Sequence, residues 1–180
     1  MNTIRPAAMA AGALCLAAMF AGCHPSPPYN IEVRIDEKDP RLAAQSIEVN
    51  IIAVGEDELP TWEQMSVNKY WKPNNPLRSS PDASSMMRLM TFARGQSPVQ
   101  IISRKDEIWD RWLKQRGATH VVVLAYLPWI TEDQPGSADQ RRAILPLSGK
   151  RWKWSGWGDR TIPIKLLHRG LVIEKELKPE

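Results

Sequence analysis

The chain has 180 residues, a formal net charge of +4, and charged side chains spread along its length. This length suits one domain with a substantial core, and the lack of any Lys/Arg block argues against binding to a nucleic-acid backbone. The two cysteines, Cys15 and Cys23, both lie near the start, which excludes a cysteine-based zinc site and a disulfide in the domain that follows.

Residues 1–22 have the pattern of a secretory signal peptide, in which Arg5 precedes an Ala/Leu/Met-rich run. The run ends in Ala21 and Gly22 directly before Cys23. This ending resembles the lipobox of bacterial lipoproteins, where the cysteine thiol accepts a diacylglyceryl group and becomes the first mature residue. The alternatives are cleavage without lipidation, a chance cysteine, and an uncleaved membrane helix, for which the run is short of the ~20 apolar residues needed.

Residues 23–29 form a predicted lipidated linker, because its prolines favour a stiff, extended chain. Two or more acyl chains, such as palmitate, hold a protein stably in a bilayer, whereas one holds it only reversibly. His24, rather than an aspartate, follows the cysteine, and by resemblance to sorted lipoproteins this favours the outer membrane. We therefore expect a protein anchored in the outer membrane through acylated Cys23 and facing the periplasm.

The first strands are predicted from alternating apolar and polar residues at 31–35 and 47–54. The charged stretch between them is interpreted as the loop of an antiparallel pair. A short helix is expected from Thr61, whose hydroxyl can cap it, within an otherwise irregular segment up to Pro81. Residues 86–92 and 99–102 are the next expected strands.

Residues 103–116 have the clearest helical pattern in the chain. Ser103 is the expected N-cap and Gly117 the expected stop. Trp109 and Trp112 belong to one apolar face, which must pack on a sheet.

Residues 119–127 are apolar on both faces and predict a central strand. Weaker strands are expected at 141–147 and 151–154, followed by a hairpin of 162–167 and 171–177. The sequence therefore predicts a mainly β domain over residues 30–180, a single β-sandwich of seven or eight strands with one inserted amphipathic helix.

No pattern in the sequence predicts an enzyme, a metal site or a cofactor. His24, His120 and His168 are scattered without metal-ligand spacing, and His120, flanked by valines, is expected to be a packed structural histidine. Ser155 lacks the glycine two residues before the serine that a nucleophile elbow needs. We expect no catalytic residue and no bound metal or cofactor.

A basic stretch near the end of the chain contains Trp152, Trp154 and Trp157. Aromatic rings of this kind are usually buried in a core, but they can also stack on the sugar rings of the cell wall. A periplasmic module that binds peptidoglycan through these three residues is therefore the alternative function.

The order of the predicted elements resembles the small outer-membrane lipoprotein family of the type VI secretion membrane complex. The similarity lies in residues 31–36 with 47–54, in Phe92-Ala-Arg-Gly95, in residues 117–126 and in the terminal hairpin. The resemblance implies a transthyretin-like sandwich without enzymatic activity, tethered by lipid, that holds the periplasmic end of an inner-membrane secretion component.

In that family the partner is bound by the loop between the first two strands. The matching segment here contains Lys38, Asp39, Arg41 and Leu42, which become the candidate partner-binding residues. The segment lacks the family's Leu-Asn pair, and the alternative is an ordinary polar hairpin loop. The function predicted first is an envelope lipoprotein with a structural or protein-interaction role.

Overall fold

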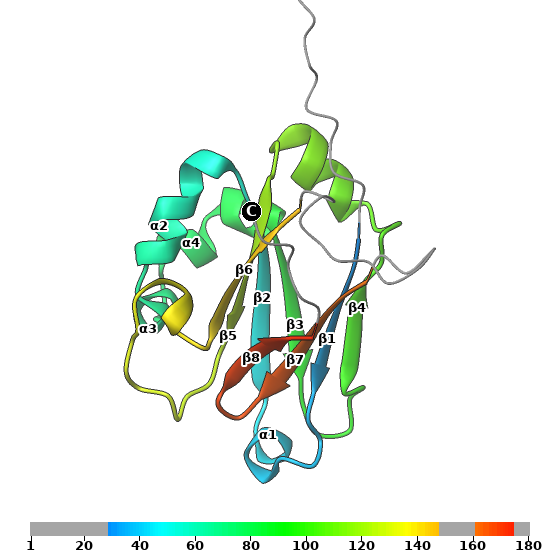
Figure 1. The fold of residues 1–180 in the computed structure, drawn as a ribbon, viewed down its shortest axis with the longest axis vertical. Helices are drawn as coiled ribbons and strands as arrows, with labels where there is room; N and C mark the ends of the chain where they lie inside the picture. Colours follow the sequence, from blue (N-terminus) through cyan, green and yellow to red (C-terminus); the bar gives the residue numbers. More distant parts are fainter. Residues whose placement is uncertain (1–28, 148–160, 175–180) are drawn as a thin grey trace, which may run out of the picture.

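The computed structural model describes residues 29–147 and 161–174, which form eight strands in two four-stranded sheets (Figure 1). Sheet A has the strand order β4-β1-β7-β8 and sheet B the order β3-β2-β5-β6. The predicted mainly β sandwich is confirmed. The strands are β1 (Asn30–Ile35), β2 (Ile47–Val54), β3 (Met87–Phe92), β4 (Val99–Ile102), β5 (His120–Ala125), β6 (Arg142–Pro146), β7 (Thr161–Leu167) and β8 (Gly170–Ile173).

Several short helices accompany the sheets, so the prediction of one inserted helix is wrong in number. The segment expected to be mostly irregular contains most of them, because prolines there occupy the first helical turn, where they fit best. The helix expected from Thr61 begins earlier, at Leu59, and no side chain caps it. The helices are α1 (Pro40–Ala44), η1 (Glu56–Glu58), α2 (Leu59–Gln64), α3 (Val67–Tyr70), α4 (Pro76–Ser79), α5 (Pro81–Met86), the π-helical η2 (Asp110–Gln115) and η3 (Gly136–Ala138).

Strand β1 lies inside sheet A, antiparallel to β4 and parallel to β7. Strand β2 belongs to sheet B, between β3 and β5. The predicted antiparallel pairing of β1 with β2 is therefore wrong. The charged stretch between them contains α1 and crosses from one sheet to the other, and two alternating strands look alike whether they pair or separate.

Strand β5 confirms the predicted central strand, because both of its faces are buried. Val121 and Val123 face the core between the sheets. Val122 and Leu124 face a second core on the outer side of sheet B. All four side chains are inaccessible to solvent.

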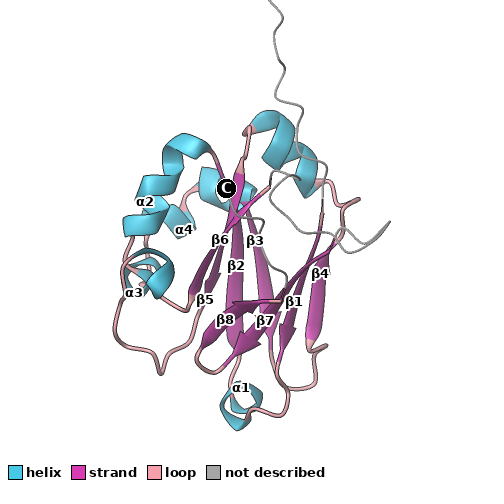
Figure 2. Ribbon diagram, in the orientation of Figure 1, coloured by secondary structure: helices cyan, strands magenta, loops and turns pink. Residues whose placement is uncertain are grey.

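A helical layer closes the outer side of sheet B, where α2, α3 and α4 lie beside the strands (Figure 2). Trp62, Val67 and Tyr70 pack from these helices onto β2 and β5. The Tyr70 hydroxyl accepts a 2.7 Å hydrogen bond from the Asn50 amide, so a polar residue of the sheet is also engaged. Burial raises the pKa of Tyr70 to about 12.

The helix expected over residues 103–116 is shorter in the structure, where η2 is preceded by a turn. Asp106, not Ser103, provides the side-chain bond that starts it, since its carboxylate accepts from the Ile108 amide at 3.0 Å. The buried face is as predicted, with Trp109 and Trp112 in the inter-sheet core. Gly117 follows with φ of 67°, the left-handed stop that was expected.

The predicted terminal hairpin is confirmed as β7 and β8. Gly170 has φ of 143°, and a Cβ added there would lie 2.3 Å from the Gln140 carbonyl oxygen, so only glycine fits. The Leu171 amide donates to that carbonyl at 2.6 Å, and this bond joins β8 to the segment directly before β6. The expected strand at 151–154 and the end of the expected strand 171–177 lie outside the described residues.

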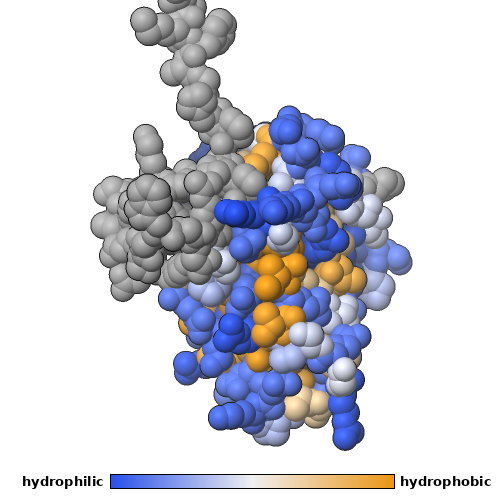
Figure 3. All heavy atoms as spheres, turned by 90° about the vertical axis from the view of Figure 1, so that its right-hand side faces the viewer, coloured by the Kyte–Doolittle hydropathy of each residue, from blue (hydrophilic) through white to orange (hydrophobic). Residues whose placement is uncertain are grey.

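The side of the sandwich formed by the edge strands β3 and β4 is largely hydrophilic with small apolar patches (Figure 3). Each edge strand places a polar side chain at a core-facing position. Arg88 of β3 binds both carboxylate oxygens of Asp106, at 2.7 and 2.6 Å. Gln100 of β4 donates to the Thr91 carbonyl of β3 at 2.6 Å. Inward-pointing polar residues of this kind discourage pairing with a foreign strand.

Candidate interaction site

One end of the sandwich brings together the loop after β1 and the turn of the β7–β8 hairpin (Figure 1). The parallel register aligns Ile35 with Leu166, and the Asp36 amide donates to the Leu166 carbonyl at 3.2 Å. The segments that follow β1 and β7 therefore begin at the same end of sheet A. We call residues 36–45 and 167–169 the α1 pole.

Asp39 links the two segments of the α1 pole. Its carboxylate accepts from the Arg41 amide at 3.0 Å, which caps α1, and lies 2.5 Å from Nδ1 of His168. Partial burial raises the pKa of Asp39, but the bonds from Arg41 and His168 outweigh it and hold that pKa below its ordinary value. Asp39 is therefore an internal acceptor that ties α1 to the hairpin turn.

Leu42 anchors α1 to the rest of the molecule. Its side chain is 1% exposed and belongs to the core between the sheets. Pro40 at the start of α1 has its backbone angle already suited to a helix. Of the four candidate residues, Leu42 therefore faces inward, and the exposed side chains are those of Lys38 and Arg41.

The hairpin turn is held in place by the loop after β5. The indole nitrogen of Trp129 donates to the His168 carbonyl at 2.5 Å. Together with the Asp39 bond, this places both the ring and the backbone of His168. Arg169, the next residue, is exposed at the tip of the turn.

A hollow of about 500 Å³ lies between the two segments of the α1 pole. It is lined by Asp36, Lys38, Asp39, Pro40, Arg41, Leu167, His168 and Arg169. A smaller hollow of about 140 Å³ lies on the other side of α1, where Ala43 meets the turn after β3. Helix α1 therefore contributes residues to two hollows, Pro40 and Arg41 to the larger and Leu42 and Ala43 to the smaller.

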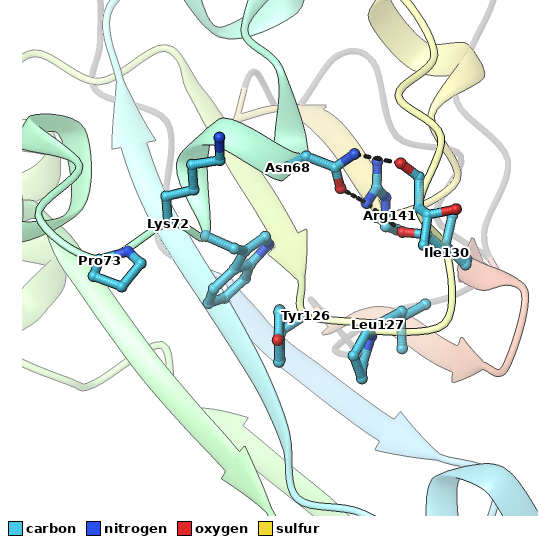
Figure 4. A pocket seen from close by; sticks show the side chains of 10 residues that line it. Asn68, Lys72, Pro73, Tyr126, Leu127, Ile130 and Arg141 are labelled. Atoms are coloured by element: carbon cyan, nitrogen blue, oxygen red, sulfur yellow. Dashed lines mark hydrogen bonds between the residues drawn. The ribbon is translucent and has the colours of Figure 1, made fainter.

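A third hollow, of about 340 Å³, lies between α3 and the loop after β5 (Figure 4). Trp71 and Tyr126 form an aromatic wall, with ring centroids 5.2 Å apart, beside Lys72 and Pro73. At its polar end, Arg141 donates to the Asn68 amide oxygen at 2.6 Å. We call this depression the aromatic hollow.

Arg141 is the centre of a buried hydrogen-bond network beneath the aromatic hollow. It is 2% exposed and binds the carboxylates of Asp139 and Asp133 at 2.7 and 2.8 Å. Burial raises the pKa of each aspartate, but for Asp139 the Arg141 bonds, and for Asp133 bonds led by Ser66, outweigh it and hold the pKa below its ordinary value. These charges are fully paired, and the network fixes the loop rather than offering an acid or base.

The remaining sequence candidates are placed as follows. His120 is half-buried at the start of β5, with Nδ1 3.6 Å from the Glu56 carboxylate, consistent with a structural role. Cys23 and the three tryptophans Trp152, Trp154 and Trp157 lie outside the described residues. Among residues 29–147 and 161–174 no group of three His, Cys, Asp or Glu side chains is arranged for a metal ion. In the same ranges no helix has the length and apolar character to cross a membrane.

No family model matches the sequence, and no curated protein does either. Among solved structures, the type VI secretion lipoprotein TssJ1 from Pseudomonas aeruginosa is similar, with 9% identity, a TM-score of 0.42, and coverage of 85% of this chain and 100% of that one. Serratia marcescens Lip, a membrane-bound component of the type VI secretion system, is similar with 18% identity and a TM-score of 0.43, over 86% of this chain and 99% of that one. The similarity is one of fold, and we assign no residue of this chain a function from it.

Sequence reasoning singled out the loop after β1 but not the β7–β8 turn that lies beside it in the structure. His168 and Arg169 complete the α1 pole from a point 129 residues further along the chain than Asp39. The only sequence signal for them was a hairpin turn, and only the parallel pairing of β1 with β7 brings that turn to the loop. The aromatic hollow was missed for the same reason, since Trp71 and Tyr126 belong to separate segments.

Proposed function

We propose that this protein is a bacterial envelope lipoprotein with a structural role, anchored by acylated Cys23 and binding a protein partner at its α1 pole. In its specific form, the proposal is an outer-membrane anchor of a type VI secretion complex, whose partner is the periplasmic part of an inner-membrane component. The lipobox pattern of residues 1–23 and the family resemblance of the strand-loop-strand segment support it.

The observation that supports the proposal best is the separation of the tether from the α1 pole. Cys23 is only six residues before Tyr29, which is buried at the start of β1. Strand β1 then runs the length of sheet A, about 20 Å for six residues, and ends at the α1 pole. A membrane attached at one end leaves the pole at the other end facing away from it, toward a partner that approaches from the opposite side.

The anchor is tested by Cys23→Ser, because serine has no thiol to accept the glyceryl carbon. We expect the variant to move from the membrane fraction to the soluble periplasmic fraction on fractionation of cells. Cys15→Ser, which changes the other cysteine of the leader, is the matched control and should leave the protein membrane-bound. A Cys23→Ser protein that stays in membranes contradicts the anchor.

The partner contact is tested by placing a photo-crosslinking residue at position 38 or at position 104 in living cells. Arg104 is also exposed but lies at the tether end, where its amide donates to the Asn30 side chain. We expect position 38 to crosslink to a protein with an inner-membrane anchor, identified by mass spectrometry, and position 104 not to. Crosslinks from position 104 alone, or from neither position, contradict the proposal.

A further inference from the structure

The charges at the α1 pole are unevenly satisfied. Asp36 accepts from the Lys38 amide at 3.2 Å and has the Lys165 ammonium 3.8 Å away. Asp39 is engaged by the Arg41 amide and by His168. The two carboxylates that line the hollow are therefore already occupied by groups of this chain, whereas Glu37, the third acidic residue of the pole, is exposed and lines the smaller hollow.

The cations of the pole have no such partners. Lys38, Arg41 and Arg169 are exposed, and none forms an ion pair with an acidic residue that the structure describes. All three line the same hollow. The hollow thus has free cationic groups along its rim and no free anion to match them.

The lining of the hollow also has an apolar part, formed by Pro40 and Leu167. Its volume of about 500 Å³ accommodates side chains of a bound segment rather than a single small ion. Guanidinium groups bind carboxylates through paired, directional hydrogen bonds, and Arg41 and Arg169 bring two of them to the hollow from different segments. The chemistry that complements this surface is that of an extended chain bearing carboxylates.

Anionic lipid headgroups carry a similar charge, but the orientation of the molecule disfavours them. The short tether leaves the domain from the start of β1, and the α1 pole lies at the far end of that strand. The headgroups of the protein's own membrane are therefore on the opposite side. An acidic protein segment reaches the pole without this restriction.

We propose that the α1 pole recognises an acidic segment of its protein partner, with Lys38, Arg41 and Arg169 binding its carboxylates. This inference rests on the proposed function, because it names the chemistry of the same contact. It assigns Arg169, which no sequence pattern indicated, as a binding residue.

The test uses the full lipidated protein in nanodiscs of zwitterionic lipid and a short peptide of alternating Glu and Ser. We expect binding of this peptide, measured by fluorescence anisotropy, to weaken with salt and to fall at least about tenfold in Lys38→Glu/Arg41→Glu/Arg169→Glu. The same charge change at the tether end, Arg104→Glu/Lys105→Glu/Arg111→Glu, is the matched control and should bind as well as wild type. The variant Lys38→Gln/Arg41→Gln/Arg169→Gln should bind with intermediate strength.

Three results overturn the inference: no peptide binding to wild type, equal loss in the control, or capture of phosphatidylglycerol vesicles instead of the peptide. Urea unfolding of each variant shows that a loss of binding is not a loss of fold. The photo-crosslink from position 38 separates the two proposals. If it persists when Arg41→Glu/Arg169→Glu is added to the crosslinking protein, the partner contact stands and acidic recognition is wrong. If the crosslinking protein without these changes gives no such crosslink, the proposed function itself fails.

Discussion

At the scale of single residues, the adjacent Arg141 and Arg142 show two ways to bury a guanidinium group. Arg141 is neutralised by the carboxylates of Asp139 and Asp133. Arg142, 3% exposed, instead donates to backbone carbonyls, including those of Trp62 and Gly136. An unpaired buried charge is strongly unfavourable, so each guanidinium group must keep its partners. Through these bonds both arginines tie the long loop after β5 to the helical layer.

Asp139→Asn is expected to change how stability depends on pH. The folded pKa of Asp139 lies below its unfolded value of about 3.8, so its ionised form stabilises the fold above that pH, and this stabilisation is lost as pH falls through the folded pKa. The variant should be about 3 kcal/mol less stable at neutral pH, since Arg141 loses its closest counter-charge. Urea unfolding measured between neutral pH and about pH 3 should show a shallower loss of stability on acidification.

Asp110→Asn is the control for this prediction. Asp110 pairs with Lys114 at 2.9 Å, but its side chain is 68% exposed, so the pair contributes little. Its stability profile with pH should follow that of the wild type. A profile for Asp139→Asn that is equally parallel to the wild type contradicts the stabilising role of the Arg141 pair.

At the scale of secondary-structure elements, helix α1 depends on tertiary contacts. A five-residue helix is too short to be stable alone. Asp39 caps it, the hairpin turn holds Asp39, and Leu42 packs in the core beneath it. The exposed side chains of Lys38 and Arg41 are therefore positioned by Asp39, His168 and Leu42.

Leu42→Ala is expected to lower the free energy of unfolding by about 2–4 kcal/mol, because it leaves a cavity under α1. The loss is read from urea unfolding, and the crosslink from position 38 should weaken with it. Ala43→Ser, at the exposed neighbouring position, should change neither measurement. A Leu42→Ala protein of wild-type stability contradicts the anchoring role.

Elements whose pattern reflects their own burial were predictable from the sequence. The apolar run Val121–Leu124 indicated a strand buried on both faces, and the structure buries it on both. Of the helices between η1 and β3, only the one near Thr61 was predicted, because four- to six-residue helices contain too few turns to display an apolar face. The pairing of β1 was missed because alternation specifies a face and not a neighbour.

At the scale of the whole molecule, sheet B is shared by two hydrophobic cores. The inter-sheet core lies on one of its faces and the helix-covered core on the other. Because β2 and β5 contribute to both, neither core can lose its packing without disturbing the other. We expect the two layers to unfold together.

This cooperativity is tested with Val122→Ala and Val123→Ala, neighbours on β5 that are both fully buried but face opposite cores. Each should lower stability by roughly 1–3 kcal/mol and shift one common transition. Tryptophan fluorescence and far-ultraviolet circular dichroism should report the same midpoint for each variant. Separate midpoints in Val122→Ala indicate a helical layer that melts by itself.

Only one of the two segments of the α1 pole was predictable from the sequence, because the other reaches the pole through the pairing of strands. Its loop could be singled out from residues 36–45, but the hollow exists because β7 lies parallel to β1 and returns the chain to the same end. Parallel neighbours are joined by long connections, and no local pattern specifies which strands become neighbours. Arg169 therefore had no distinguishing feature until the sheets were seen.

The polar residues on the inner side of the β3 and β4 edges have a consequence for crowding. Lipoproteins anchored as proposed share a two-dimensional surface, where copies meet far more often than in solution at the same abundance. Exposed strand edges on such neighbours risk joining into continuous sheets. With Arg88 engaged by Asp106 and Gln100 occupying the Thr91 carbonyl, these edges offer a poor template. If the protein is anchored as proposed, copies can therefore crowd on one leaflet without their β3 and β4 edges joining into a continuous sheet.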